Sequence, residues 1–89
     1  MAHFPGGSAW AMVKDIAEGY YLVTERSFRT FGAVEMDRIQ FELDRRLREV
    51  RGDQPDLEDL PAIQLRNRRL QRLQSAQMIL HAFRARMKR

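Results

Sequence analysis

The side chains that most often carry catalysis or bind metals are few in this sequence, and they are not spaced for such chemistry. The chain has no cysteine, which excludes a thiol nucleophile, a cysteine-ligated metal and a disulfide scaffold. Neither His3 nor His81 has a Cys, an Asp or a second His three or four residues away, so neither belongs to a metal-binding motif. No serine lies in a Gly-x-Ser-x-Gly turn. We therefore predict no catalytic residue, no cofactor and no bound metal.

Acidic side chains between residues 35 and 49 could in principle supply a general acid and a general base. Each of them, however, is close in sequence to an arginine, and this alternation is typical of a solvent-facing helix surface with ion pairs. The five carboxylates are Glu35, Asp37, Glu42, Asp44 and Glu49. The sequence therefore favours a protein that binds over an enzyme.

Charge is distributed unevenly along the chain. The 89 residues include 16 Lys+Arg and 12 Asp+Glu, which gives a formal charge of +4. Residues 52–60 contain four carboxylates and no cation, whereas residues 61–89 contain eight cations and no carboxylate. Nearly all the cations are arginine, whose planar guanidinium binds phosphates and carboxylates through two donors at once. A GC-rich gene is the alternative explanation, because it supplies arginine without any functional need.

Length and hydropathy place the chain among single-domain proteins. A chain of 89 residues forms one domain at most, and its 44% hydrophobic residues are too many for a disordered protein. No apolar run approaches the ~18 residues that span a bilayer, and residues 1–7 lack the features of a secretory signal. We expect a cytoplasmic protein with a flexible N-terminus over residues 1–7 and one helical domain over residues 8–89.

Apolar spacing predicts a first helix over about residues 8–31. Apolar residues recur every three or four positions from Val13 to Phe31, and Ser8 can accept a hydrogen bond from a free first-turn N–H group. Gly19 weakens this helix near its middle. We expect Gly32 to end the helix in a left-handed conformation, although one longer helix bent at Gly32 is also compatible with the pattern.

Two further helices are predicted over about residues 33–51 and 61–87, with an acidic link over residues 52–60 between them. Gly52 is expected to end the second helix, and Asp59 and Pro61 mark the start of the third. The predicted core stripe of the second helix is Met36, Ile39, Leu43, Leu47 and Val50, and that of the third includes Leu73, Ala76, Leu80 and Phe83. The short link predicts an antiparallel hairpin, and Leu57 and Leu60 are expected to pack beneath it. The fold class is thus all-α, with three helices of which the last is long and basic.

Large apolar side chains also occur away from these stripes, and three helices of this size cannot bury them all. Scattered exposed apolar residues are one explanation. An interface is the other, because aromatic residues, Met and Arg are enriched there. We predict a homodimer that acts as a small regulator or adaptor by binding a larger protein. The residues expected to make contact are Trp10, Tyr21, Phe41, Met78 and Ile79, with Arg68 and Arg72 for electrostatic orientation.

Nucleic-acid binding through the basic third helix is the alternative function. Arg66, Arg68, Arg72 and Arg86 would contact phosphates. No aromatic residue interrupts this basic face to stack on bases, and the sequence shows no helix-turn-helix pattern. Binding of the helix to an anionic membrane is the least favoured alternative, because the core explains the apolar stripe better.

Overall fold

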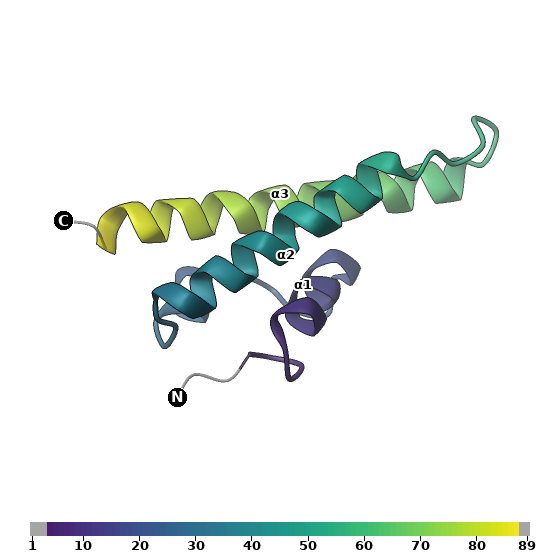
Figure 1. The fold of residues 1–89 in the computed structure, drawn as a ribbon. Helices are drawn as coiled ribbons and strands as arrows, with labels where there is room; N and C mark the ends of the chain where they lie inside the picture. The colour runs from purple at the N-terminus through teal and green to yellow at the C-terminus, as the bar shows by residue number, and fades with distance from the viewer. Residues whose placement is uncertain (1–3, 88–89) are drawn as a thin grey trace.

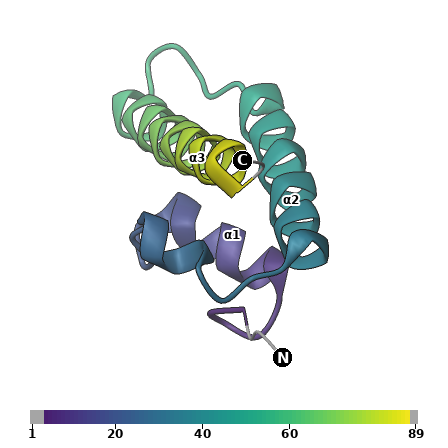
Figure 2. The same ribbon diagram turned by 90° about the vertical axis from the view of Figure 1, so that its left-hand side faces the viewer.

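A computed structural model describes residues 4–87, and this part of the chain is helical without any strand. His3, Lys88 and Arg89 lie outside the described residues, as does part of the N-terminus that we predicted to be flexible. The elements are α1 (Ala9–Glu18), the 3-10 helix η1 (Glu25–Phe28), α2 (Ala33–Gly52) and α3 (Leu60–Met87). Helices α2 and α3 pack closely along one another, and α1 lies beneath both of them (Figures 1 and 2). The prediction of an all-α fold with three helices is confirmed.

One apolar core lies between the three helices and η1. The stripe predicted for α2 is buried in full, from Met36 to Val50. Helix α3 contributes Leu73, Ala76 and Leu80 as predicted. Phe28 of η1 is fully buried, and its ring centroid lies 6.4 Å from that of Phe31 and 6.0 Å from that of Phe83. These aromatic contacts fix η1 against the C-terminal half of α3.

Helix α1 is much shorter than the predicted helix over residues 8–31. It begins as expected, because Ser8 Oγ accepts a hydrogen bond from the Ala11 N–H at 3.1 Å. It ends at Glu18 because Gly19 adopts a φ of 84°, a left-handed conformation that glycine takes without a steric penalty. The N–H groups of Gly19 and Tyr20 then donate to the Ile16 and Asp15 carbonyls, which is the Schellman arrangement.

The structure differs from the prediction in three further respects. Tyr20, which the helical pattern placed in the core, is exposed. Gly32 does not end a helix, since its φ is −85° and it precedes the first turn of α2. Phe4 belongs to the segment that we predicted to be flexible, yet it is half-buried with its ring centroid 5.2 Å from that of Phe31.

The link over residues 53–59 and the adjoining ends of α2 and α3 extend beyond α1 (Figure 1). This gives the molecule extents of 47 × 26 × 18 Å. Asp59 Oδ1 accepts a hydrogen bond from the Ala62 N–H at 3.2 Å, which confirms Asp59 as the start signal of α3. Leu57 and Leu60 are exposed, so the prediction that they pack beneath the hairpin is wrong. Helix α1 does not reach this end, so no helix among residues 4–87 covers the two leucines.

An arginine from α3, and not glycine, completes the C-terminus of α2. Gly52 remains within the helix and has no positive φ, contrary to the prediction that it would end the helix in a left-handed conformation. Arg66 Nε donates to the carbonyl oxygens of Val50 at 3.2 Å and Asp53 at 2.7 Å, and Arg66 Nη2 donates to the Arg51 carbonyl at 3.1 Å. One guanidinium therefore donates to three carbonyls at this end of α2, of which that of Val50 also accepts the Asp53 N–H.

Arg66→Ala is expected to lower the free energy of unfolding by about 1–2 kcal/mol, because three charged hydrogen bonds, one of them partly buried, are lost. Arg66→Lys is expected to recover only part of this loss, since a single ammonium group cannot reproduce the guanidinium fork. Urea denaturation followed by circular dichroism measures both variants. Arg68→Ala is the control, because Arg68 bonds to no residue in the described part of the chain. Equal stability of the Arg66→Ala and Arg68→Ala variants would contradict this assignment.

Candidate protein-interaction site

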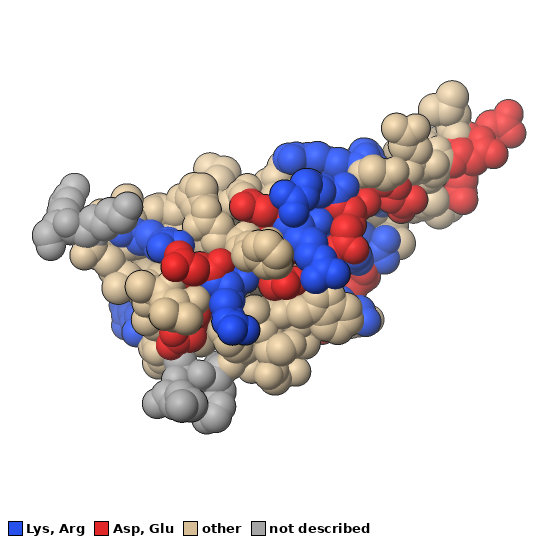
Figure 3. Space-filling view, viewed as in Figure 1, with Lys and Arg blue, Asp and Glu red and all other residues tan. Residues whose placement is uncertain are grey.

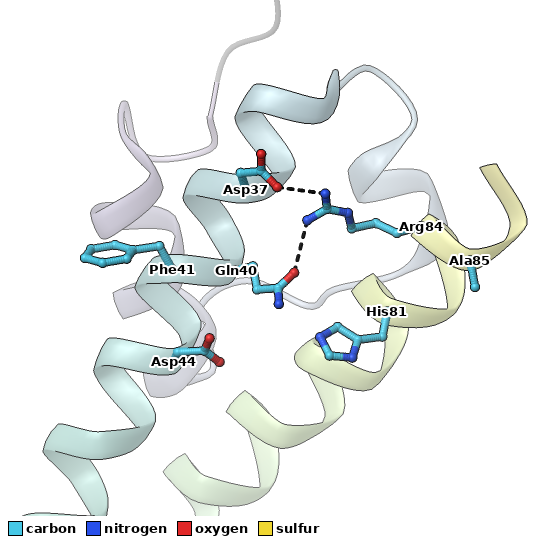
Figure 4. A pocket seen from close by; sticks show the side chains of 7 residues that line it. All are labelled: Asp37, Gln40, Phe41, Asp44, His81, Arg84 and Ala85. Atoms are coloured by element: carbon cyan, nitrogen blue, oxygen red, sulfur yellow. Dashed lines mark hydrogen bonds and ion pairs between the residues drawn. The ribbon is translucent and has the colours of Figure 1, made fainter. Parts of the chain in front are cut away.

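Three surface grooves are candidates for a functional site, and the largest is the least suitable for an apolar partner. It lies between α2 and α3, has a volume of about 700 Å³, and includes Phe41 and His81 in its lining. Arg84 crosses it, with Nη2 2.7 Å from Asp37 Oδ1 and Nη1 3.0 Å from Gln40 Oε1 (Figure 4). Figure 4 shows the Phe41 ring pointing away from Arg84 and His81. Asp37, Gln40 and Arg84 therefore already bond to one another within this groove.

A second groove, of about 520 Å³, lies between α1 and α2 and includes Trp10, Val34 and Phe41. Trp10 and Phe41 are 51% and 60% exposed. The Nζ atom of Lys14 lies 5.2 Å from the centroid of the Trp10 ring, so a cation already occupies one side of that ring. Charges of both signs are mixed over the neighbouring surface of α2 (Figure 3). The charges around this groove therefore do not favour a partner of either sign.

The third groove, which we call the α1–α3 groove, is lined mainly by apolar residues. It has a volume of about 350 Å³ and lies between α3 and the chain that follows α1. Its lining consists of Ile16, Gly19, Tyr21, Leu22, Val23, Gln71, Arg72, Ser75, Ala76 and Ile79. Leu22 is 85% exposed, whereas Tyr21 and Ile79 are half-buried and pack against the core. No carboxylate is part of the lining.

The shape of this groove depends on where α1 ends. Gly19 turns the chain, and residues 22–24 continue without regular secondary structure, so that Leu22 and Val23 lie opposite α3. Arg72 Nη1 donates to the Ala17 carbonyl at 3.1 Å, which supplies a partner for a carbonyl that the Schellman hydrogen bonds leave free. The other guanidinium nitrogens of Arg72 form no hydrogen bond with any residue between 4 and 87. Arg72 thus places both positive charge and free donors at the groove.

The C-terminal end of α1 also carries Glu18, which lies between two arginines. Arg69 Nε is 2.8 Å from Glu18 Oε1, and Arg46 Nη2 is 3.9 Å from the same oxygen. The end of a helix carries partial negative charge, so a carboxylate there needs nearby cations. Arg46 and Arg69 supply them from α2 and α3, which joins the three helices at this point.

The structure divides the seven predicted contact residues between two surfaces. Tyr21, Arg72 and Ile79 line the α1–α3 groove. Arg68 precedes Arg72 by one helical turn, and Met78 follows Ser75 by three residues, so both lie beside the groove. Trp10 and Phe41 belong instead to the groove between α1 and α2. Sequence reasoning missed Leu22 as a lining residue because the predicted long helix placed it on a remote face.

Three of the four arginines proposed for nucleic-acid binding have partners within the protein. Arg66 bonds to the end of α2, Arg72 bonds to the end of α1, and Arg86 forms an ion pair with Glu25. Arg68 alone among the four has no such partner in the part of the chain that the structure describes. The free basic surface of α3 is therefore smaller than the sequence suggested.

The described residues include neither a metal-binding cluster nor a membrane-spanning helix. Residues 4–87 contain no group of three or more His, Cys, Asp or Glu side chains that could hold a metal ion. In the same residues, no helix is both long and apolar enough to cross a membrane. Comparison with models of known families, with curated proteins and with solved structures finds no match to this chain. The assignment of a function therefore rests on the surface of the molecule itself.

Proposed function

We propose that this protein is a small non-enzymatic regulator or adaptor that binds a larger protein through the α1–α3 groove. The observation that carries this proposal is the exposure of large apolar side chains at one groove that has no carboxylate in its lining. Leu22 is 85% exposed and Met78 is 72% exposed, although both are large apolar residues. Burial of such a side chain contributes a free energy of about 1.5–3 kcal/mol. An exposed side chain gains this free energy only when a partner covers it.

Charge indicates what kind of segment would fit. Arg72 offers guanidinium donors at the groove, and Arg68 lies one turn away without a partner in the described residues. A partner segment with apolar anchors and flanking carboxylates would satisfy both the apolar lining and these cations. Such a segment is an acidic amphipathic helix, because its apolar residues lie on one face and its carboxylates beside them.

We also propose that α2 and α3 form an antiparallel hairpin, that the protein is a homodimer and that it is cytoplasmic. The hairpin is supported by contacts that join opposite ends of the two helices. Asp37 near the start of α2 pairs with Arg84 near the end of α3, whereas Val50 near the end of α2 bonds to Arg66 near the start of α3. Nucleic-acid binding remains an alternative, but no contact in the structure favours it.

Fluorescence polarisation tests this function with two labelled peptides of matched length and leucine content, one rich in glutamate and the other in lysine. We expect the acidic peptide to bind and the basic peptide not to bind. Leu22→Asp is expected to weaken binding about tenfold or more, because it removes an apolar contact and adds a repelling charge. Leu22 is exposed, so this substitution leaves the core intact.

Val34→Asp is the matched control, because Val34 is an exposed aliphatic residue in the groove between α1 and α2. Loss of binding in the Val34→Asp variant, with the Leu22→Asp variant unaffected, would assign the function to that other groove. Binding of the basic peptide alone would contradict the proposal outright. Amide shifts in NMR spectra locate the contact independently, and we expect them at Leu22, Val23, Ser75 and Ile79.

A further inference from the structure

The link over residues 53–59 and the first residue of α3, Leu60, form an acidic tip at one end of the molecule (Figure 1). Acidic side chains gather at this end in the space-filling view, apart from the mixed charges over α2 (Figure 3). The four carboxylates are Asp53, Asp56, Glu58 and Asp59, and none forms an ion pair with a residue that the structure describes. Leu57 is 88% exposed and Leu60 is also exposed. The tip therefore combines apolar anchors and free carboxylates, which is the chemistry that the α1–α3 groove lacks.

The tip is held in shape by its own hydrogen bonds. Arg66 Nε donates to the Asp53 carbonyl at 2.7 Å, and Asp56 Oδ1 accepts from the Glu58 N–H at 3.2 Å. Asp59 accepts from the first turn of α3. An ordered segment loses less conformational entropy when it binds than a flexible one does. The tip is thus prepared to act as a ligand.

One face of α3 connects the tip to the groove, and it carries no charge although the helix is rich in arginine. Its residues recur at helical spacing and are all exposed: Leu60, Gln64, Asn67, Gln71 and Met78. Charged residues are depleted from the centres of protein interfaces, where amides can pair across the contact. This uncharged face, with an apolar residue at each end, is suited to pack against another helix.

We infer that the groove of one copy receives the acidic tip of a second copy, with the two α3 helices side by side in opposite directions. Tip and groove lie about 22 Å apart along α3, because some 15 residues separate them at 1.5 Å each. In a two-fold arrangement each copy therefore supplies one tip and one groove, and both contacts form at once. This inference rests on the proposed function of the groove, and it implies that a larger partner must displace the second copy.

A charge exchange tests the pairing in the full chain. Glu58→Arg changes the tip, and Arg68→Glu changes the border of the groove; neither side chain has a bonding partner in the residues described. We expect each substitution alone to raise the dimer dissociation constant about tenfold, because it places a repelling charge at the contact between tip and groove. The double variant is expected to recover most of the wild-type affinity. Sedimentation equilibrium measures the dissociation constants.

The adjacent pair Arg48→Glu and Glu49→Arg on α2 is the matched control, and we expect no change in dimer affinity from either substitution. Circular dichroism confirms that every variant is folded. Leu57→Ser is a second test, because it removes an apolar anchor from the tip without altering charge, and we expect a weaker dimer. A monomer at all concentrations, a dimer that neither charge change affects, or a double variant that recovers nothing would each overturn the inference.

Titration of the wild-type protein with the acidic peptide separates this inference from the proposed function. If both hold, the peptide binds and dissociates the dimer. If the peptide binds to a protein that remains monomeric, the groove is functional but the second copy is not its ligand. If the tip-dependent dimer forms and an excess of peptide neither binds nor dissociates it, the groove serves self-association and the proposed function is wrong.

Discussion

Phe28→Ala is expected to lower the free energy of unfolding by about 3–5 kcal/mol, which is the usual cost of removing a fully buried aromatic side chain. Phe28 has no exposed surface, and its ring contacts Phe31 and Phe83. Its loss would leave a cavity between η1 and α3. Since domains of this size have little stability to spare, we expect a large fraction of the variant to be unfolded at 37 °C. Thermal denaturation followed by circular dichroism measures the effect.

Phe41→Ala provides the comparison, because the same side chain is 60% exposed there. We expect a change of less than about 0.5 kcal/mol in the free energy of unfolding, as for most surface substitutions. A comparable loss from both substitutions would show that the Phe41 ring is covered in solution, for instance by another copy. Dilution of the sample would then restore the difference between the two variants.

Gly19→Ala is expected to lower the free energy of unfolding by about 2–3 kcal/mol. A residue other than glycine at a φ of 84° costs about 1–3 kcal/mol by itself. A Cβ atom at this position would also lie 2.9 Å from Cζ of Arg72, so the guanidinium that bonds to the Ala17 carbonyl would have to shift. Urea denaturation of the single variants and of the double variant with Arg72→Ala separates the two contributions.

We expect the losses from Gly19→Ala and Arg72→Ala to sum to more than the loss in the double variant, because the steric conflict disappears with the guanidinium. Gly52→Ala is the control for backbone entropy. Gly52 lies at the end of α2 with a negative φ and with open space around its Cα, so alanine there is expected to stabilise the protein by up to about 1 kcal/mol. Destabilisation by Gly52→Ala that equals that of Gly19→Ala would contradict this explanation.

The parts of the fold that the sequence predicts well are those fixed by helical periodicity and by local capping. The α2 stripe from Met36 to Val50 is buried in full, and Ser8 and Asp59 begin α1 and α3 as their side-chain oxygens suggest. Each of these features depends on residues within one or two turns of one another. Periodicity and capping therefore suffice to identify them without knowledge of the rest of the chain.

The predictions that failed depended on contacts between distant residues or on the conformation of single glycines. The apolar spacing from Val13 to Phe31 fits one continuous helix. In the structure, however, Phe28 reaches the core from the separate 3-10 helix η1. Apolar periodicity alone cannot distinguish one long helix from two short helices that bury the same residues. The local signal of the break is Gly19, which weakens a helix although apolar residues at helical spacing lie on both sides of it.

For the candidate site, the sequence indicates several of the residues that line the groove but not how they are arranged in space. Tyr21, Arg72 and Ile79 lie off the main apolar stripes of the sequence, and in the structure they line one groove. Leu22 joined them only because the chain turns at Gly19. Arg66 and Arg72 were interpreted as free surface charges, whereas each completes the end of a helix that lies far away in the sequence. No property of a single helix reveals such a role.

The hydrogen bond from Arg72 to the Ala17 carbonyl has a consequence for how the chain folds during synthesis. It joins residues 55 positions apart, and closing so long a loop is slow because of its entropic cost. A nascent chain that ends before α3 lacks this bond and also lacks Leu73, Ala76 and Leu80, which cover the core. Helix α1 leaves the ribosome before α3 and is thus fully stabilised only after α3 has been made, and until then part of its apolar face is open to chaperones and proteases.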